Sequence, residues 1–288
     1  MLCLSDFYNN EWKLMCYKLP KLICLLCCVF AVNGYAAEHA LELQKGLKRF
    51  DKQTVLGSQS SLDIKDVFIG DNVLAKTILL VDKGGEIHNI TGGSVSSMVK
   101  VSFFQPYMES RLEQLIELKF NKKNGFIEQI SSTYRIDSAY LDLSLVREKV
   151  LVAAIKKYGE PLSLSDIQQI TERQTPEINV SSFIDKLKPN QYVAELVKMY
   201  FSKHDISRNS KFTSDTEGRA IMHTGFDLCY LWERDNFAEI LSLCAFDPRE
   251  ANASNRGVEL NLHDFSVQQR ITEQKKSSVK YDPLSIAL

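Results

Sequence analysis

Residues Leu115–Tyr134 read Leu-Ile-Glu-Leu-Lys-Phe-Asn-Lys-Lys-Asn-Gly-Phe-Ile-Glu-Gln-Ile-Ser-Ser-Thr-Tyr. Ile116, Leu118 and Phe120 alternate with charged residues, as in a strand that buries one face, because successive side chains of a strand point to opposite sides. Asn124-Gly125 supplies the residues that tolerate the positive φ angles of a tight hairpin turn. This stretch therefore predicts a β-hairpin.

A helix is expected directly after the hairpin, from about Leu141 to Tyr158. Its apolar residues recur near one stripe, as in a helix that packs on a core: Leu143, Val146, Val150, Ala153 and Tyr158. Gly159 can adopt the left-handed cap and Pro161 prevents continuation. We expect the helix to lie across the inner face of the neighbouring hairpin sheet, since both need an apolar partner.

The N-terminus is typical of a secretory signal peptide over residues 1–36. Lys13, Lys18 and Lys21 precede an uncharged apolar run over 22–32, and Gly34 and Ala36 give a small-x-small cleavage site between Ala36 and Ala37. The apolar run is shorter than the roughly 20 residues that a spanning helix needs. A secreted or periplasmic protein without a stable membrane span after cleavage is therefore expected.

Two alternatives at the N-terminus stay open. Translation starting at Met15 would give a more compact basic region. Lipidation is a minor alternative, because Leu26-Cys27-Cys28 lacks the small residue that precedes a modified cysteine.

Residues 37–161 are expected to form an α+β module. Besides the hairpin and its helix, the pattern predicts a short strand or extended entry over 62–71, a helix over 73–80 capped by Asn72 or Asp71, and a strand over 98–104. Residues 162–211 predict a helical insertion, with helices near 163–173, 180–187 and 192–201 and a polar loop over 203–219. Ser163 or Ser165 is the expected cap of the first of these helices.

Residues 212–288 return to the alternation of strands. Strands are expected over 226–233, 240–246 and 258–262, with a short last strand over 266–271 and a frayed polar tail from Thr272. These strands either complete the first sheet or form a second module. The fold class is therefore α+β: antiparallel sheet with packed helices and a helical insertion.

Composition excludes few classes of protein. The chain is 44% hydrophobic and 25% charged, as in ordinary globular proteins. Its formal net charge is −1, with basic and acidic residues interspersed, so a nucleic-acid partner is not expected.

No catalytic, cofactor-binding or metal-binding residues are assigned from the sequence. Ser97–Lys100 and Ser277–Lys280 match Ser-x-x-Lys, but the companion motifs of penicillin-recognising enzymes are missing. The five histidines have no metal-ligand spacing.

Cys229 and Cys244 form the one pair of cysteines that can be argued to bond, since an exported protein meets an oxidising compartment. A hairpin turn centred on Asp235-Asn236 would place Cys229 opposite Ser242, with Cys244 one diagonal step away. A bulge would then be needed to bring the two cysteines opposite each other, and two buried thiols are the alternative.

Three aromatic residues share one face of the expected strand over 226–233: Phe226, Tyr230 and Trp232. They could line a binding face. A place in the core is favoured, because aromatic side chains supply the largest burial per residue.

The order of these elements resembles secreted bacterial proteins built from small α+β modules of the BamE/SmpA type. The resemblance is carried by Ile64–Gly70 before a helix, the hairpin over 120–130, the helix end Lys157-Tyr158-Gly159-Glu160-Pro161, and the strand with Tyr230-Leu231-Trp232. It implies a non-catalytic envelope protein.

The sequence thus favours an exported, non-enzymatic protein that binds an envelope component or a protein partner. A secreted hydrolase with dispersed active-site residues is the first alternative, and a cytoplasmic or membrane-anchored protein the second. The less regular segments 83–97 and 203–224 are the expected places for function, since the hairpin and its helix are explained by packing.

Overall fold

The structure is a computed structural model that describes residues 47–50, 59–92, 96–107, 110–135, 142–188, 193–204, 210–224, 227–246 and 257–279. The chain divides into two units, Met1–Arg49 and Phe50–Leu288. All elements except the short 3-10 helix η1 (Lys48–Phe50) lie wholly in the second unit. The expected signal peptide and its cleavage site at Ala36/Ala37 lie outside the described residues.

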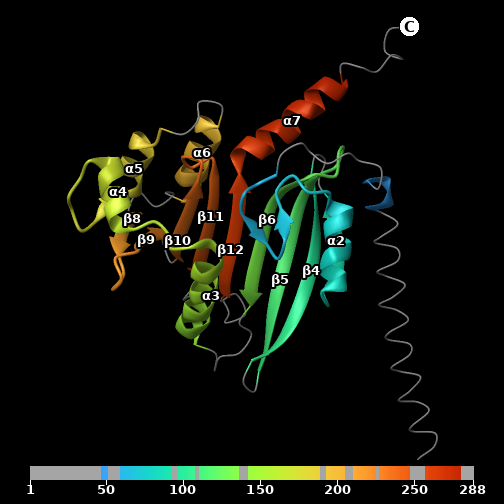
Figure 1. The fold of residues 1–288 in the computed structure, drawn as a ribbon, viewed down its shortest axis with the longest axis horizontal. Coiled ribbons are helices and arrows are strands. Elements are labelled where there is room, and N and C mark those ends of the chain that lie inside the picture. The colour runs from blue at the N-terminus through green and yellow to red at the C-terminus, as the bar shows by residue number, and fades with distance from the viewer. Residues whose placement is uncertain are drawn as a thin grey trace, which may run out of the picture. The chain divides into compact units, whose positions relative to one another are not determined.

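A ten-stranded antiparallel sheet forms the centre of the second unit (Figure 1). Its strands, in spatial order, are β3 (Glu86–Gly92), β4 (Ser96–Tyr107), β5 (Ser110–Asn121), β6 (Ile127–Arg135), β12 (Gly257–Asp264), β11 (Glu239–Phe246), β10 (Asp227–Arg234), β9 (Ala220–Thr224), β8 (Lys211–Ser214) and β7 (Ile178–Asn179). A hairpin of β1 (Asp63–Ile64) and β2 (Val67–Phe68) is separate from it. The predicted α+β class is confirmed.

Two runs of neighbouring strands meet at the pairing of β6 with β12. The N-terminal run is β3 to β6, in which each strand pairs with the next along the chain. The C-terminal run returns from β7 to β12, and its last strand pairs antiparallel with β6 from Leu262↔Ile130 to Gly257↔Arg135. One continuous sheet is the result.

The first face of the sheet, here called the α2–α3 face, is apolar from β5 to β10. In-register residues on neighbouring strands all point to this face: Ile116, Leu118, Ile130, Leu262, Leu241 and Trp232. Helix α2 (Val73–Asp82), the β1–β2 hairpin and helix α3 (Leu143–Tyr158) cover it, as Figure 1 shows.

The opposite face differs between the two halves of the sheet. Over the C-terminal strands it is apolar, with Phe212, Met222, Cys229 and Leu231 in one buried cluster. That cluster also contains residues of α4 (Leu164–Thr171), α5 (Val180–Lys186) and α6 (Ala194–His204). Over β4 to β6 the same face carries mainly polar side chains.

The helix starts predicted from local sequence are observed. Asn72 caps α2 by accepting hydrogen bonds from the amides of Leu74 and Ala75. Ser163 and Asp166 form a capping box at the start of α4, which satisfies two amides that a helix end leaves without partners.

Helix α3 lies on the apolar inner face of the sheet, as predicted, but the strands beneath it differ from those expected. Helix α3 packs on β11 and β12 rather than on the hairpin strands that precede it. The cause is its C-terminal end, where the Trp232 indole donates to the carbonyl of Gly159 at 2.7 Å and the Arg234 guanidinium donates to that of Tyr158 at 3.0 Å. Ala153, which was predicted to face the core, is exposed, and its neighbour Ala154 is buried instead.

The predicted last strand over 266–271 is also wrong, because these residues begin helix α7 (Phe265–Val279). Val267 and Ile271 are four residues apart and both fully buried, as on one side of a helix. Helix α7 extends beyond Thr272, where a frayed tail was expected. Strands β3, β7, β8 and β9 were not predicted, and β8 lies within the expected loop 203–219.

Cys229 and Cys244 form a disulfide, with their Cα atoms 4.1 Å apart. The predicted register is wrong, because the β10–β11 turn contains four residues, Asp235 to Ala238, rather than two. The longer turn places Cys229 directly opposite Cys244 and Leu231 opposite Ser242. No bulge is needed, and both cysteines lie in the core beneath the helices.

Replacing both cysteines, as Cys229→Ala with Cys244→Ala, should lower the free energy of unfolding by about 2–4 kcal/mol, because the disulfide constrains the unfolded chain. Urea unfolding of the double variant and of the wild type with reductant should give the same lowered midpoint. Equal midpoints for the oxidised wild type and the double variant would contradict the disulfide's role.

Candidate functional site

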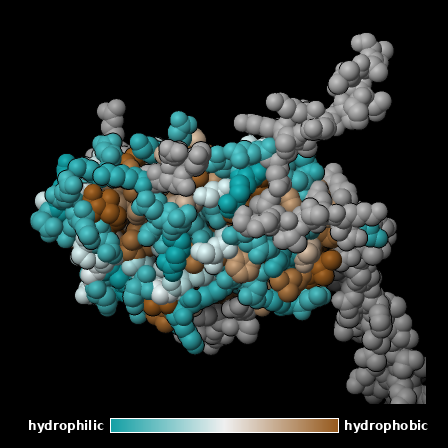
Figure 2. Space-filling model, turned by 45° about the horizontal axis from the view of Figure 1, so that its top comes forward, coloured by the Kyte–Doolittle hydropathy of each residue, from teal (hydrophilic) through white to brown (hydrophobic). Residues whose placement is uncertain are grey.

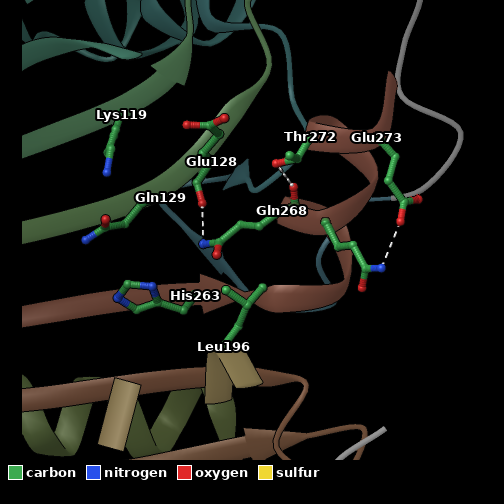
Figure 3. A pocket seen from close by; sticks show the side chains of 9 residues that line it. Lys119, Glu128, Gln129, Leu196, His263, Gln268, Thr272 and Glu273 are labelled. Carbon is green, nitrogen blue, oxygen red and sulfur yellow. Dashed lines mark hydrogen bonds between the residues drawn. The ribbon is translucent and has the colours of Figure 1, made fainter. Parts of the chain in front are cut away.

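An open groove of about 440 Å³ lies where the polar half of the opposite face meets α6 and α7. Figure 3 shows side chains from β5, β6 and β12 on one side and from α7 on the other, with Leu196 of α6 at one end. Nine residues line it: Lys119, Glu128, Gln129, Leu196, His263, Gln268, Gln269, Thr272 and Glu273. Eight of the nine are polar.

Lys119 and Gln129 reach the groove because the strand alternation that buries Leu118 and Ile130 turns them the other way. They are direct partners on β5 and β6. Both side chains are partly exposed. The residues that make the hairpin fold therefore also fix the direction of these two polar groups.

A β-bulge shapes the floor of the groove. Lys119 pairs with Gln129 and Phe120 pairs with Ile127, which leaves Glu128 as the extra residue of β6. The side-chain amide of Gln268 donates to the Glu128 carbonyl at 2.6 Å, as drawn in Figure 3. Bulges redirect side chains and are common beside functional sites. Here the bulge also fixes α7 to the sheet.

The polar surface continues from the groove across the sheet. Lys100, Glu117, Ser131 and Asn261 are in-register neighbours on four strands. Lys100 and Glu117 form an ion pair. Burial raises the pKa of Glu259, on the same face, while hydrogen bonds from Asn261 and Thr133 oppose the shift. The side of the molecule drawn in Figure 2 is also mainly hydrophilic, with small separate hydrophobic patches.

Aromatic rings support the groove beside α6. The His263 ring stacks on Phe265 with centroids 5.8 Å apart, and Tyr200 of α6 lies 5.1 Å from the same imidazole. Burial raises the pKa of Tyr200 to about 12, so its phenol stays protonated at neutral pH. These contacts fix the imidazole at the groove wall.

None of the nine lining residues is a serine or a cysteine. Thr272 is the single hydroxyl among the nine lining residues, and it donates to the carbonyl of Gln268 within its own helix at 2.9 Å. Outside the groove, Ser97 pairs with the core residue Phe120, whereas Lys100 points to the polar face. The first Ser-x-x-Lys match therefore cannot work as a catalytic pair, and Lys280 of the second lies outside the described residues.

Metal-binding clusters and membrane-spanning helices are not found in the described part of the chain. There, no group of three His, Cys, Asp or Glu side chains comes close enough to hold a metal ion. None of the described helices is both long and apolar enough to cross a membrane.

The predicted site residues lie elsewhere. Tyr230 and Trp232 are 4% and 1% exposed in the core of the α2–α3 face, which is the favoured interpretation, and Phe226 lies outside the described residues. No lining residue falls in segments 83–97 or 203–224. The signal that could have found the groove is the polar face of the hairpin, at Lys119 and Gln129.

No family model, curated protein or solved structure matches this chain. The resemblance to the BamE/SmpA type therefore stays a prediction, and function is inferred from the groove itself.

Replacing Gln268 with Ala should cost about 1 kcal/mol, because the partly buried bond to the bulge carbonyl is lost. The matched control is Gln269→Ala, whose amide bonds to Glu273 on the surface of α7 and whose loss should cost at most about 0.5 kcal/mol. Chemical denaturation of both variants measures the difference. Equal stabilities would show that Gln268 does not fix α7 to the sheet.

Proposed function

We propose that this chain is an exported, non-enzymatic binding protein whose groove receives an extended polar segment of a protein partner. The observation that carries the proposal is the groove itself, where side chains from two strand runs and two helices converge on one polar hollow. Recognition sites are commonly concave with convergent polar groups.

The chemistry of the lining favours a peptide over other ligands. Gln129, Gln268 and Gln269 carry amides, which offer both a donor and an acceptor and so match the peptide group. The lining contains one lysine and two glutamates, a formal charge of 1 − 2 = −1 with His263 neutral, so the groove does not select a strongly charged ligand. None of the nine lining residues is Phe, Tyr or Trp, so the groove has no flat aromatic platform of the kind that stacks on nucleobases.

Export is supported by two independent features. The N-terminal sequence is typical of a signal peptide. The Cys229–Cys244 disulfide is of the kind that persists in oxidising compartments outside the cytoplasm.

The hydrolase alternative has less support. Among the described residues, the groove brings together Lys119, His263 and two carboxylates but no serine or cysteine. A hydrolase that uses a side-chain nucleophile would need one within hydrogen-bond reach of its base.

The test is co-purification from the native envelope fraction with the full-length, oxidised protein. A protein bound by the wild type should be lost with Lys119→Ala plus Gln129→Ala, because both side chains point into the groove. The control, Lys156→Ala plus Gln169→Ala, changes the same residue types on exposed sites of α3 and α4 and should retain the partner.

Two outcomes would contradict the proposal. One is a partner that both double variants retain or both lose. The other is a bound component that survives protease treatment, which would indicate an envelope glycan rather than a protein. Circular dichroism of both variants should confirm that each is folded.

A further inference from the structure

Glu239, at the start of β11, is a buried carboxylate that binds a distant part of the chain. It is 4% exposed. One oxygen accepts the amide of Leu62 at 2.7 Å, and the other accepts the amide of Ser61 at 3.1 Å as well as its hydroxyl. These contacts fix the segment before β1 to the C-terminal half of the sheet.

Asp264 lies directly opposite Glu239 at the end of β12. It is 6% exposed, and its side chain accepts the amide of Val267 at 2.8 Å, as an N-cap residue does. Helix α7 begins at the next residue and supplies four of the groove residues. Figure 1 shows α7 leaving the sheet from the end of β12.

The surroundings of Asp264 disfavour its charge. Burial is the largest cause and raises its pKa to about 6, and the Glu239 carboxylate acts in the same direction. The amides of Val267 and Ser266 and the Arg270 guanidinium of α7 oppose the shift without cancelling it. Arg270 is exposed, so solvent screens its charge.

We propose that Asp264 and Glu239 form a proton-sensitive clamp at the start of α7, which holds this wall of the groove more firmly in mildly acidic solution than at neutral pH. When α7 and the end of β12 open, Asp264 leaves its buried place beside Glu239 and enters water. A charged Asp264 gains solvation free energy from that opening, and a protonated one does not.

The direction follows from proton linkage. An aspartate in the open chain titrates near 3.8, below its value in the closed form. Between these two values the closed form binds the proton more strongly, so acid favours closure. Opening of α7 should become easier as the pH rises through this window, by up to about a hundredfold, and should level off above it.

The clamp would regulate the groove, and this consequence rests on the proposed function. A partner that contacts Gln268, Gln269, Thr272 or Glu273 needs α7 in place, so acid should favour its binding. The clamp itself requires no partner and is tested on the free protein.

The experiment is amide hydrogen exchange of the full-length, oxidised protein at pH 5.0 and pH 7.5, corrected for intrinsic exchange rates. In the wild type, amides of 268–279 should lose about tenfold in protection between pH 5.0 and pH 7.5, because part of the titration lies below pH 5. Asp264→Asn keeps an acceptor for the Val267 amide but cannot ionise, so its α7 should be equally protected at both pH values.

The control is Asp227→Asn, which removes another carboxyl whose pKa burial raises, on β10. It should leave the pH dependence of α7 unchanged. Equal protection of α7 at both pH values in the wild type would overturn the clamp, as would a full pH response in Asp264→Asn. If the wild type captures no protein partner while its α7 keeps the pH response, only the proposed function is contradicted, and the clamp stands.

Discussion

The pairing of β6 with β12 is the contact on which the rest of the structure depends. It joins strands more than a hundred residues apart in the chain and makes one sheet from two strand runs. Ile130 and Leu262 meet there as fully buried partners, and burying each such side chain contributes about 2 kcal/mol. Since α7 starts where β12 ends, the same pairing brings Gln268 to the Glu128 bulge and creates the groove.

The C-terminal half depends on an unfavourable turn. Asp235, Asn236 and Phe237 all have positive φ, which is costly for residues with side chains, at about 1–2 kcal/mol each. Burial of the Phe237 ring against Phe183 and Phe201 offsets this cost. The Glu233 carboxylate also accepts the Phe237 amide at 3.0 Å. This four-residue turn sets the register that places the two cysteines opposite each other.

Local sequence predicted the elements whose signals are local. The Asn124-Gly125 hairpin, the Asn72 and Ser163 caps and the Gly159 helix end were all found where alternation, capping and turn chemistry placed them. Contacts between distant residues were missed: the packing of α3 depends on Trp232, and the register of β10 depends on Phe237. The groove was missed because Lys119, His263 and Gln268 come from three elements, and α7 was taken for a strand.

The most direct test of the account is site-specific photo-crosslinking in native cells, with a benzophenone-bearing amino acid in place of Gln129. The account predicts a discrete adduct with one protein at position 129 and none at Gln169, an exposed glutamine of α4, which supplies no lining residue. Equal adducts at both positions, or adducts at Gln169 alone, would contradict the claim that the groove is where this protein binds its partner.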